Sequence, residues 1–150
     1  NWPSNPVNNI IKSIENSFPK FKKKFNSKHL KLSICDFGCG DAKIAKYFDS
    51  KKFKSKHNDI SIIVHSFDFI SINKYITACN IEDISKYVPN KSINIGVFCL
   101  SLMGRDFHKF MAEAYRVIKP YGLLKIAEVR SRLYSITKFT SFINSCGFEI

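Results

Sequence analysis

The residues best suited to chemistry lie in one stretch, residues 33–41, which reads Ser-Ile-Cys-Asp-Phe-Gly-Cys-Gly-Asp. An apolar run ends there in an aspartate, Gly38 and Gly40 follow, and an amphipathic segment begins at Asp41. This order is typical of the strand, tight turn and helix that open a nucleotide-binding βαβ unit. Glycines leave the backbone open to a ligand, and the free N–H groups at a helix start favour a polar or anionic one. Two glycines after a strand also occur in simple turns, so the motif needs support from elsewhere in the chain.

A second acidic residue supports a nucleoside site. Asp68 closes the next apolar run, residues 60–67, and a carboxylate there can accept hydrogen bonds from both ribose hydroxyls. Such an acid is expected ~20 residues after the glycines, whereas Asp68 lies 30 residues after Gly38. The lysine-rich segment 49–59, predicted to be a surface insertion or mobile loop, accounts for the excess.

Strand and helix patterns alternate along the chain and position these residues. Apolar periodicity predicts helices over residues 7–18, 41–48, 107–118 and 133–146, and a helical connection over 81–88. Pro19 is expected to stop the first helix, and residues 21–25 to lead through a polar loop. Strands are predicted to end at Asp36 and Asp68 and to cover residues 75–79, 93–102 and 123–129, with another beginning at 148.

This alternation predicts an α/β fold, a doubly wound, mostly parallel sheet of the Rossmann-like type. We expect a single domain over residues 1–150, with a helical lead-in over 1–31 and a core over 32–150 whose final strands are not covered. Asn80 and Ile81 follow the third strand, where Asn80 can bond the edge of an adenine and Ile81 can pack on its face. A plain turn at a strand end would explain the same two residues.

Composition excludes several classes of protein. The chain has 150 residues, 45% of them hydrophobic and 24% charged, which is typical of a soluble globular domain and not of a disordered one. No apolar run approaches the ~20 residues that span a bilayer, so no membrane partner is expected. The five cysteines form no C-x-x-C pair, which favours free thiols in a reducing compartment and predicts no metal site.

The net charge of +12 is large for this length, and lysine supplies most of the basic residues. A surface that attracts a polyanion such as RNA would explain it. A compositional bias toward lysine, asparagine and isoleucine would explain it equally well.

The wider motif pattern separates two families that share this fold. An NAD-binding domain would prefer G-x-G-x-x-G, but Ala42 and Lys43 continue the motif here without a third glycine. The helix ending R-V-I-K-P, a glycine turn and an apolar strand instead resemble class I S-adenosylmethionine-dependent methyltransferases. The chain is similar to the ribosomal RNA-processing protein 8 (nucleomethylin) family, with motifs in the same order: W-P-S-N-P, D-F-G-C-G-D, H-S-F-D, G-V-F-C-L-S-L-M-G, E-A-Y-R-V-I-K-P and L-L-K-I-A-E-V-R-S-R.

The resemblance implies an S-adenosylmethionine-dependent enzyme of the nucleus and nucleolus that forms N1-methyladenosine in large-subunit ribosomal RNA. Ribosomal RNA and nucleolar proteins would be its partners. A non-catalytic S-adenosylmethionine-binding module for nuclear interactions or silencing remains the alternative.

The resemblance also implies roles for residues. Gly38 would approach the methionine part of the cofactor, Gly40 would shape the turn, and Asp68 would take the ribose hydroxyls. Asn80 and Ile81 stand where the family usually has Asp-Met. The predicted cofactor-binding residues are Gly38, Gly40, Asp68, Asn80, Ile81 and Cys99.

On the substrate side, adenine N1 already carries a lone pair, so no strong general base is required and no catalytic residue is named. The target adenine must be unpaired or flipped out, because N1 lies on its pairing edge. Tyr121 replaces a usual glycine, which is expected to be harmless in a turn. The predicted substrate-side residues are Trp2, Asn5, Leu102, Met103 and Gly104.

Overall fold

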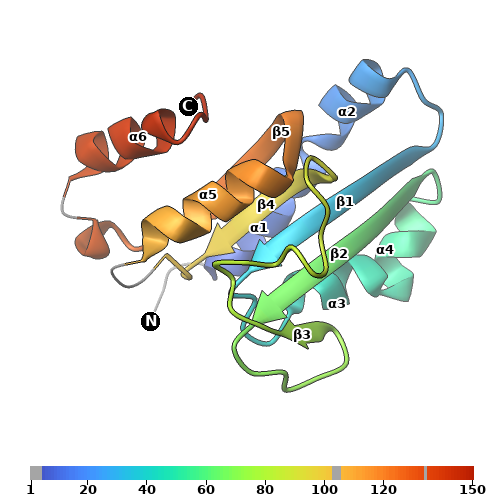
Figure 1. The fold of residues 1–150 in the computed structure, drawn as a ribbon. Helices are drawn as coiled ribbons and strands as arrows, with labels where there is room; N and C mark the ends of the chain where they lie inside the picture. The colour runs from blue at the N-terminus through green and yellow to red at the C-terminus, as the bar shows by residue number, and fades with distance from the viewer. Residues whose placement is uncertain (1–4, 103–105, 134) are drawn as a thin grey trace.

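A computed structural model describes residues 5–102, 106–133 and 135–150 and contains one five-stranded parallel sheet in the order β3-β2-β1-β4-β5 (Figure 1). The strands are β1 (Leu30–Phe37), β2 (Ile60–Asp68), β3 (Ile76–Ala78), β4 (Ile93–Cys99) and β5 (Ile118–Ala127). The helices are α1 (Pro6–Glu15), α2 (Phe18–Phe25), α3 (Lys43–Asp49), α4 (Lys51–Lys56), α5 (Phe107–Val117) and α6 (Ile136–Ser145), with a short 3-10 helix, η1 (Arg130–Arg132). The predicted Rossmann-like parallel sheet is confirmed.

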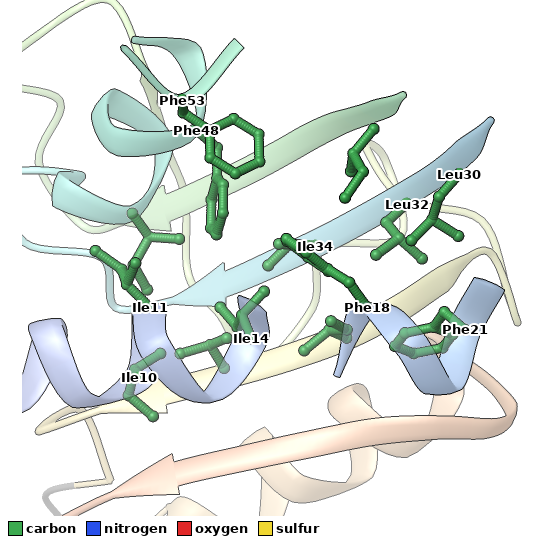
Figure 2. Packing of buried hydrophobic residues seen from close by; sticks show 14 residues of the cluster. Ile10, Ile11, Ile14, Phe18, Phe21, Leu30, Leu32, Ile34, Phe48 and Phe53 are labelled. Atoms are coloured by element: carbon green, nitrogen blue, oxygen red, sulfur yellow. The ribbon is translucent and has the colours of Figure 1, made fainter. Parts of the chain in front are cut away.

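The sheet is buried on both faces, as the near-continuous apolar run of β4 indicates. One face packs against α1 to α4 and forms the core that Figure 2 shows, in which Ile14, Phe18 and Ile34 meet side chains of the other helices. The opposite face packs against α5 and α6 around Phe37, Phe98 and other apolar residues. Two helical layers therefore enclose the sheet.

The prediction for Pro19 was wrong. Pro19 lies in the first turn of α2, where its missing N–H removes no helical hydrogen bond. The segment expected to be a loop is therefore a helix, which ends at Asn26 in the left-handed conformation. Phe18 and Phe21 are the buried residues that hold α2 against the sheet.

The lysine-rich segment lies mostly on the surface, as predicted, but it contains a helix and is not a mobile loop. It contains α4, which Phe53 anchors with only 3% of its surface exposed. The Phe53 ring packs edge-on against Phe48 with 4.9 Å between centroids. A single aromatic residue among lysines gives no apolar periodicity, so the sequence did not predict this helix. Its burial is nevertheless enough to hold a short helix against its neighbours.

Three further boundaries differ from the predictions. Residues 81–88 form turns and no helix, because the side chains of Asn80 and Asp83 accept hydrogen bonds from backbone N–H groups two residues later. The strand predicted from residue 123 begins at Ile118, and the helix predicted from residue 133 begins at Ile136. Residues 148–150 belong to no strand here, so the strand expected there was wrong.

Because all five strands are parallel, their carboxyl ends meet at one edge of the sheet. The central strand β1 has β2 on one side and β4 on the other, so the connections leave it in opposite directions. Ligands of open α/β sheets bind beside such a switch point.

Candidate functional site

The glycine turn after β1 has two functions. Gly38 and Gly40 have φ angles of +71° and +58°, in the left-handed region that favours glycine. A Cβ on Gly38 would lie 2.6 Å from the Cβ of Ser101, whereas a Cβ on Gly40 would meet nothing within 4 Å. Gly38 therefore allows the turn to pack against the segment after β4, and Gly40 faces open space that a ligand can use.

A pocket opens beside this turn, at the carboxyl ends of β1 and β4. The starts of α1 and α3 contribute its other walls. Its lining residues are Val7, Asp36, Gly38, Cys39, Gly40, Asp41, Lys43, Ile44 and Cys99. The structure thus brings three of the predicted cofactor-binding residues, Gly38, Gly40 and Cys99, to one pocket.

Asp36 is the buried acid of this pocket, with 2% of its surface exposed. Burial, and secondarily the negative charge of Asp68, raise the pKa of Asp36 from its ordinary 3.8 to about 7. Its Oδ1 has no hydrogen-bond partner among the described residues. A cationic group in the pocket would relieve both the missing bond and the unfavourable charge.

Asp68 ties the end of β2 to the glycine turn. Its Oδ2 accepts a hydrogen bond from the Gly40 N–H at 2.8 Å, and its Oδ1 accepts one from the Phe69 N–H at 2.7 Å. Each carboxylate oxygen keeps a second lone pair, so the group can still accept bonds from a ligand's hydroxyls. The backbone bonds fix the orientation in which it does so.

Cys99 supplies a thiol and not a nucleophile. Burial, followed by the charges of Asp36 and Glu128, raises the pKa of Cys99 to about 11. Since the thiolate is the nucleophilic form, this side chain stays protonated and unreactive near neutral pH. Its small size leaves room in the pocket.

Glu128 follows β5 at the same edge, with only 3% of its side chain exposed. Its Oε1 accepts bonds from the Val129 N–H at 2.8 Å and from Nη1 of Arg132 at 3.3 Å. Its Oε2 is buried without a partner in the described part of the chain. The carboxyl edge therefore carries buried acids on β1 and after β5, which favours cationic ligands.

The remaining predicted cofactor residues lie outside the pocket lining. Asn80 is exposed, and its Oδ1 accepts a bond from the Glu82 N–H at 3.0 Å in a turn. Ile81 is 4% exposed and packs in the core on the α5 face. Their assignment to an adenine remains a prediction.

The substrate-side predictions fall in two groups. Asn5 caps α1 by accepting a bond from the Val7 N–H at 3.1 Å, which places it next to a pocket residue. Leu102 packs against the α5-face core. Trp2, Met103 and Gly104 lie outside the described residues.

Sequence reasoning missed Asp36 and Lys43 as pocket residues. The signal for Asp36 was present, because a carboxylate directly before a glycine turn interrupts an otherwise apolar strand. Lys43 has no such signal, since lysines are frequent throughout this chain.

Two features are absent from the part of the chain that the structure describes. No group of three or more His, Cys, Asp or Glu side chains there could hold a metal ion. No helix in those ranges is both long and apolar enough to cross a membrane.

The comparisons with known proteins agree with this geometry. A family profile described as "Hypothetical methyltransferase" matches residues 1–150. Ribosomal RNA-processing protein 8 of Dictyostelium discoideum is 40% identical over 99% of this chain and 32% of its own length. The 25S rRNA (adenine(645)-N(1))-methyltransferase of Schizosaccharomyces pombe is 38% identical over 99% of this chain and 43% of its own length. The resemblance drawn from the motifs is confirmed, and the chain spans less than half of either relative.

A solved structure supports the fold alone. A SAM-dependent methyltransferase from Archaeoglobus fulgidus superposes with a TM-score of 0.59 at 12% identity, over 90% of this chain and 69% of that one.

Proposed function

The chain belongs to the family described as hypothetical methyltransferase, and on that premise we propose that it is the cofactor-binding part of an S-adenosylmethionine-dependent ribosomal RNA methyltransferase. The observation that carries the proposal is the pocket at the β1–β4 switch point, where a glycine turn and the buried carboxyl of Asp36 converge. The names of the relatives support the substrate, because they include ribosomal RNA processing and adenine-N1 methylation.

The pocket residues fit this cofactor. Its ammonium and sulfonium groups are cationic, and Asp36 offers a buried carboxyl oxygen that lacks a partner. Gly40 leaves the backbone bare toward open space, so the amino-acid part can lie against it. Asp68, fixed by two backbone bonds, would hold the ribose hydroxyls. Asn80 and Ile81 would contact the adenine, and Cys99 would line the wall.

When bound, the cofactor supplies an electrophilic methyl group, and the leaving sulfur departs as a neutral thioether. The chain's own contribution is orientation, which is worth up to ~7–11 kcal/mol in well-oriented systems. Asp36 would hold the amino-acid part of the donor and Asp68 its ribose, while the apolar walls Val7 and Ile44 would exclude water. The pocket residues need not remove a proton, because the adenine N1 lone pair is free to form the new N–C bond.

We extend the proposal to the product and the location. N1-methyladenosine in large-subunit ribosomal RNA would be the product, and the nucleus, in particular the nucleolus, the site of action. Among the described residues, Asn5 and Leu102 would lie on the substrate side. Nucleolar proteins would be its further partners.

The test combines binding and transfer. Calorimetry should detect S-adenosylmethionine binding, and mass spectrometry of nucleosides should detect N1-methyladenosine after incubation with unmodified large-subunit ribosomal RNA. Binding without any methylated nucleoside would contradict the enzyme and favour the non-catalytic module. Failure to bind the cofactor at all would contradict both.

A further inference from the structure

An irregularity at the start of β5 exposes an aromatic ring. Ile93 pairs with Ile118 and Ile95 with Leu123, so residues 119–122 bulge out opposite Asn94. Tyr121, at the tip, has a φ of +60° and is 84% exposed. Gly122 fits tightly behind it, because a Cβ there would lie 2.9 Å from the Asn94 carbonyl oxygen. The bulge therefore holds Tyr121 outward.

This arrangement is unfavourable for the fold alone. The left-handed region is sterically poor for a residue with a side chain, and a tyrosine in solvent recovers little of that strain through burial. Glycine would relieve the strain and would lose only an exposed contact of the ring with Lys24. A tyrosine in this position therefore points to a role outside folding.

The partners of Tyr121 come from a distant part of the sequence. Lys24 in α2 lies over the Tyr121 ring, with 4.8 Å from Nζ to the centroid. The neighbouring Phe25 is also exposed, and Phe21 stacks beneath it with 5.8 Å between centroids. Figure 1 shows α2 beside the amino end of β5. Two exposed rings and a lysine thus share one surface.

Further lysines lie in the same two segments, α2 and the bulge of β5. Lys20, Lys23 and Lys119 are exposed, and none of them pairs with a carboxylate among the described residues. Lys22 differs, because it binds Asp59. We call the surface formed by Lys20, Lys23, Lys24, Phe25, Lys119 and Tyr121 the Tyr121 platform.

We propose that the Tyr121 platform binds a single-stranded segment of RNA, by stacking a base on Tyr121 and pairing the lysines with phosphates. The proposal rests on the proposed function only for the identity of the RNA. Lys24 covers one face of the ring, and the other face stays open for a base. An acidic protein is the alternative partner for the lysines, but its binding would not explain the exposed Tyr121 ring.

The platform lies at the amino end of the sheet, opposite the pocket. The eight residues of β1, which join the two ends, span about 26 Å. The bound segment therefore flanks the target nucleotide at several nucleotides' distance and is not the methylated base itself. Such a contact would position a long RNA substrate and leave the pocket free.

The test compares two labelled oligomers of about 12 nucleotides, poly-uridine RNA and an abasic ribose-phosphate chain, by fluorescence anisotropy at fixed salt. Tyr121→Gly should weaken RNA binding at least about fivefold and leave abasic binding unchanged. Its melting temperature should stay equal or rise, because glycine accepts the left-handed φ. Tyr121→Phe should bind RNA like the wild type. Lys24→Gln should weaken the binding of both oligomers, since both carry phosphates.

A matched control exists on the α5 side. Lys91 lies 4.0 Å from the ring centroid of Tyr115, and Lys91→Gln should leave RNA binding unchanged. Equal RNA affinity of Tyr121→Gly and wild type, or equal losses for both oligomers, would overturn the platform. Should Tyr121→Gly fail to fold, the RNA affinities of Tyr121→Leu and Tyr121→Phe can be compared, because only phenylalanine keeps a ring for stacking. Equal RNA affinities of these two variants would overturn the proposal. These measurements need no methyl donor, so absence of N1-methyladenosine would contradict the proposed function alone.

Discussion

The two ends of the sheet differ in which ionisable side chains they carry and in how far these are buried. At the carboxyl end, Asp36 and the side chain of Glu128 are buried acids. At the amino end, α2 and the bulge of β5 present exposed lysines around Tyr121. A net charge of +12 therefore describes neither end.

The difference teaches how each end can act. Removing a carboxylate from water makes its energy depend strongly on the nearest donors and charges, so the acids select a ligand by geometry. Exposed lysines are screened and mobile, so they attract a polyanion over a surface and discriminate little. An exposed ring such as Tyr121 adds the selectivity for bases that charge alone lacks.

The largest expected effect is a loss of stability at the carboxyl end of the sheet, in the glycine turn. Gly38→Ala places a Cβ 2.6 Å from Ser101 at a φ of +71°, and strain plus overpacking should lower the free energy of unfolding by about 2–4 kcal/mol. Gly40→Ala is the matched control, because its Cβ meets open space, and it should lose only about 1 kcal/mol. Urea denaturation measures both. Equal losses would show that Ser101 does not limit the turn.

The next effect concerns Asp68. Asp68→Ala removes the acceptor of the Gly40 N–H bond and of the proposed ribose bonds, and should weaken S-adenosylmethionine binding by ~2 kcal/mol or more. Calorimetry measures the change, with Asp59→Ala at the amino end as the control that should bind normally. Unchanged affinity of Asp68→Ala would reject the ribose assignment.

The next prediction concerns how the stability of the protein depends on pH through Asp36. The raised pKa of Asp36, about 7, means that the folded state binds this proton more tightly than the unfolded chain. Its ionised form is unfavourable, so the wild type loses stability as pH rises from about 4 to 7. Asp36→Asn lacks this loss, so its melting temperature should exceed that of the wild type at pH 8 but not at pH 4.

The same substitution should weaken cofactor binding, because the cationic groups lose their carboxylate. A stability gain that is equal at pH 4 and pH 8 would contradict the role of ionisation. A gain with unchanged affinity would remove Asp36 from the proposed site.

The smallest effect concerns lysines of the amino end outside the Tyr121 platform. Lys52→Gln in α4 should lower the slope of log affinity against log salt for single-stranded RNA by about 0.7, if this helix contacts one phosphate. Lys74→Gln, in the loop before β3, is the control and should leave the slope unchanged. If RNA binding by the wild type did not depend on salt, the high lysine content would be explained by compositional bias and not by contacts with phosphates.

The sequence determined those parts of the fold and site whose causes are local. The strand, glycine turn and Asp68 were predicted because each depends on neighbouring residues, and α5 was predicted because its apolar residues repeat at helical spacing. The start of α2 at Phe18, with Pro19 in its first turn, was missed because a proline can either end one helix or begin another. The docking of α4 through Phe53 was missed because the contact is with α2 and α3.

Only the tertiary structure decided the properties that arise from residues far apart in the chain. The pKa of Asp36 depends on burial between α1, α3 and β4 and on the charge of Asp68, none of which a motif contains. Tyr121 and Lys24 meet because α2 packs beside the bulge of β5. Burial and long-range contact are properties of the packed chain. The sequence therefore determines which ionisable and aromatic groups are present, and the tertiary structure determines their pKa values and their partners.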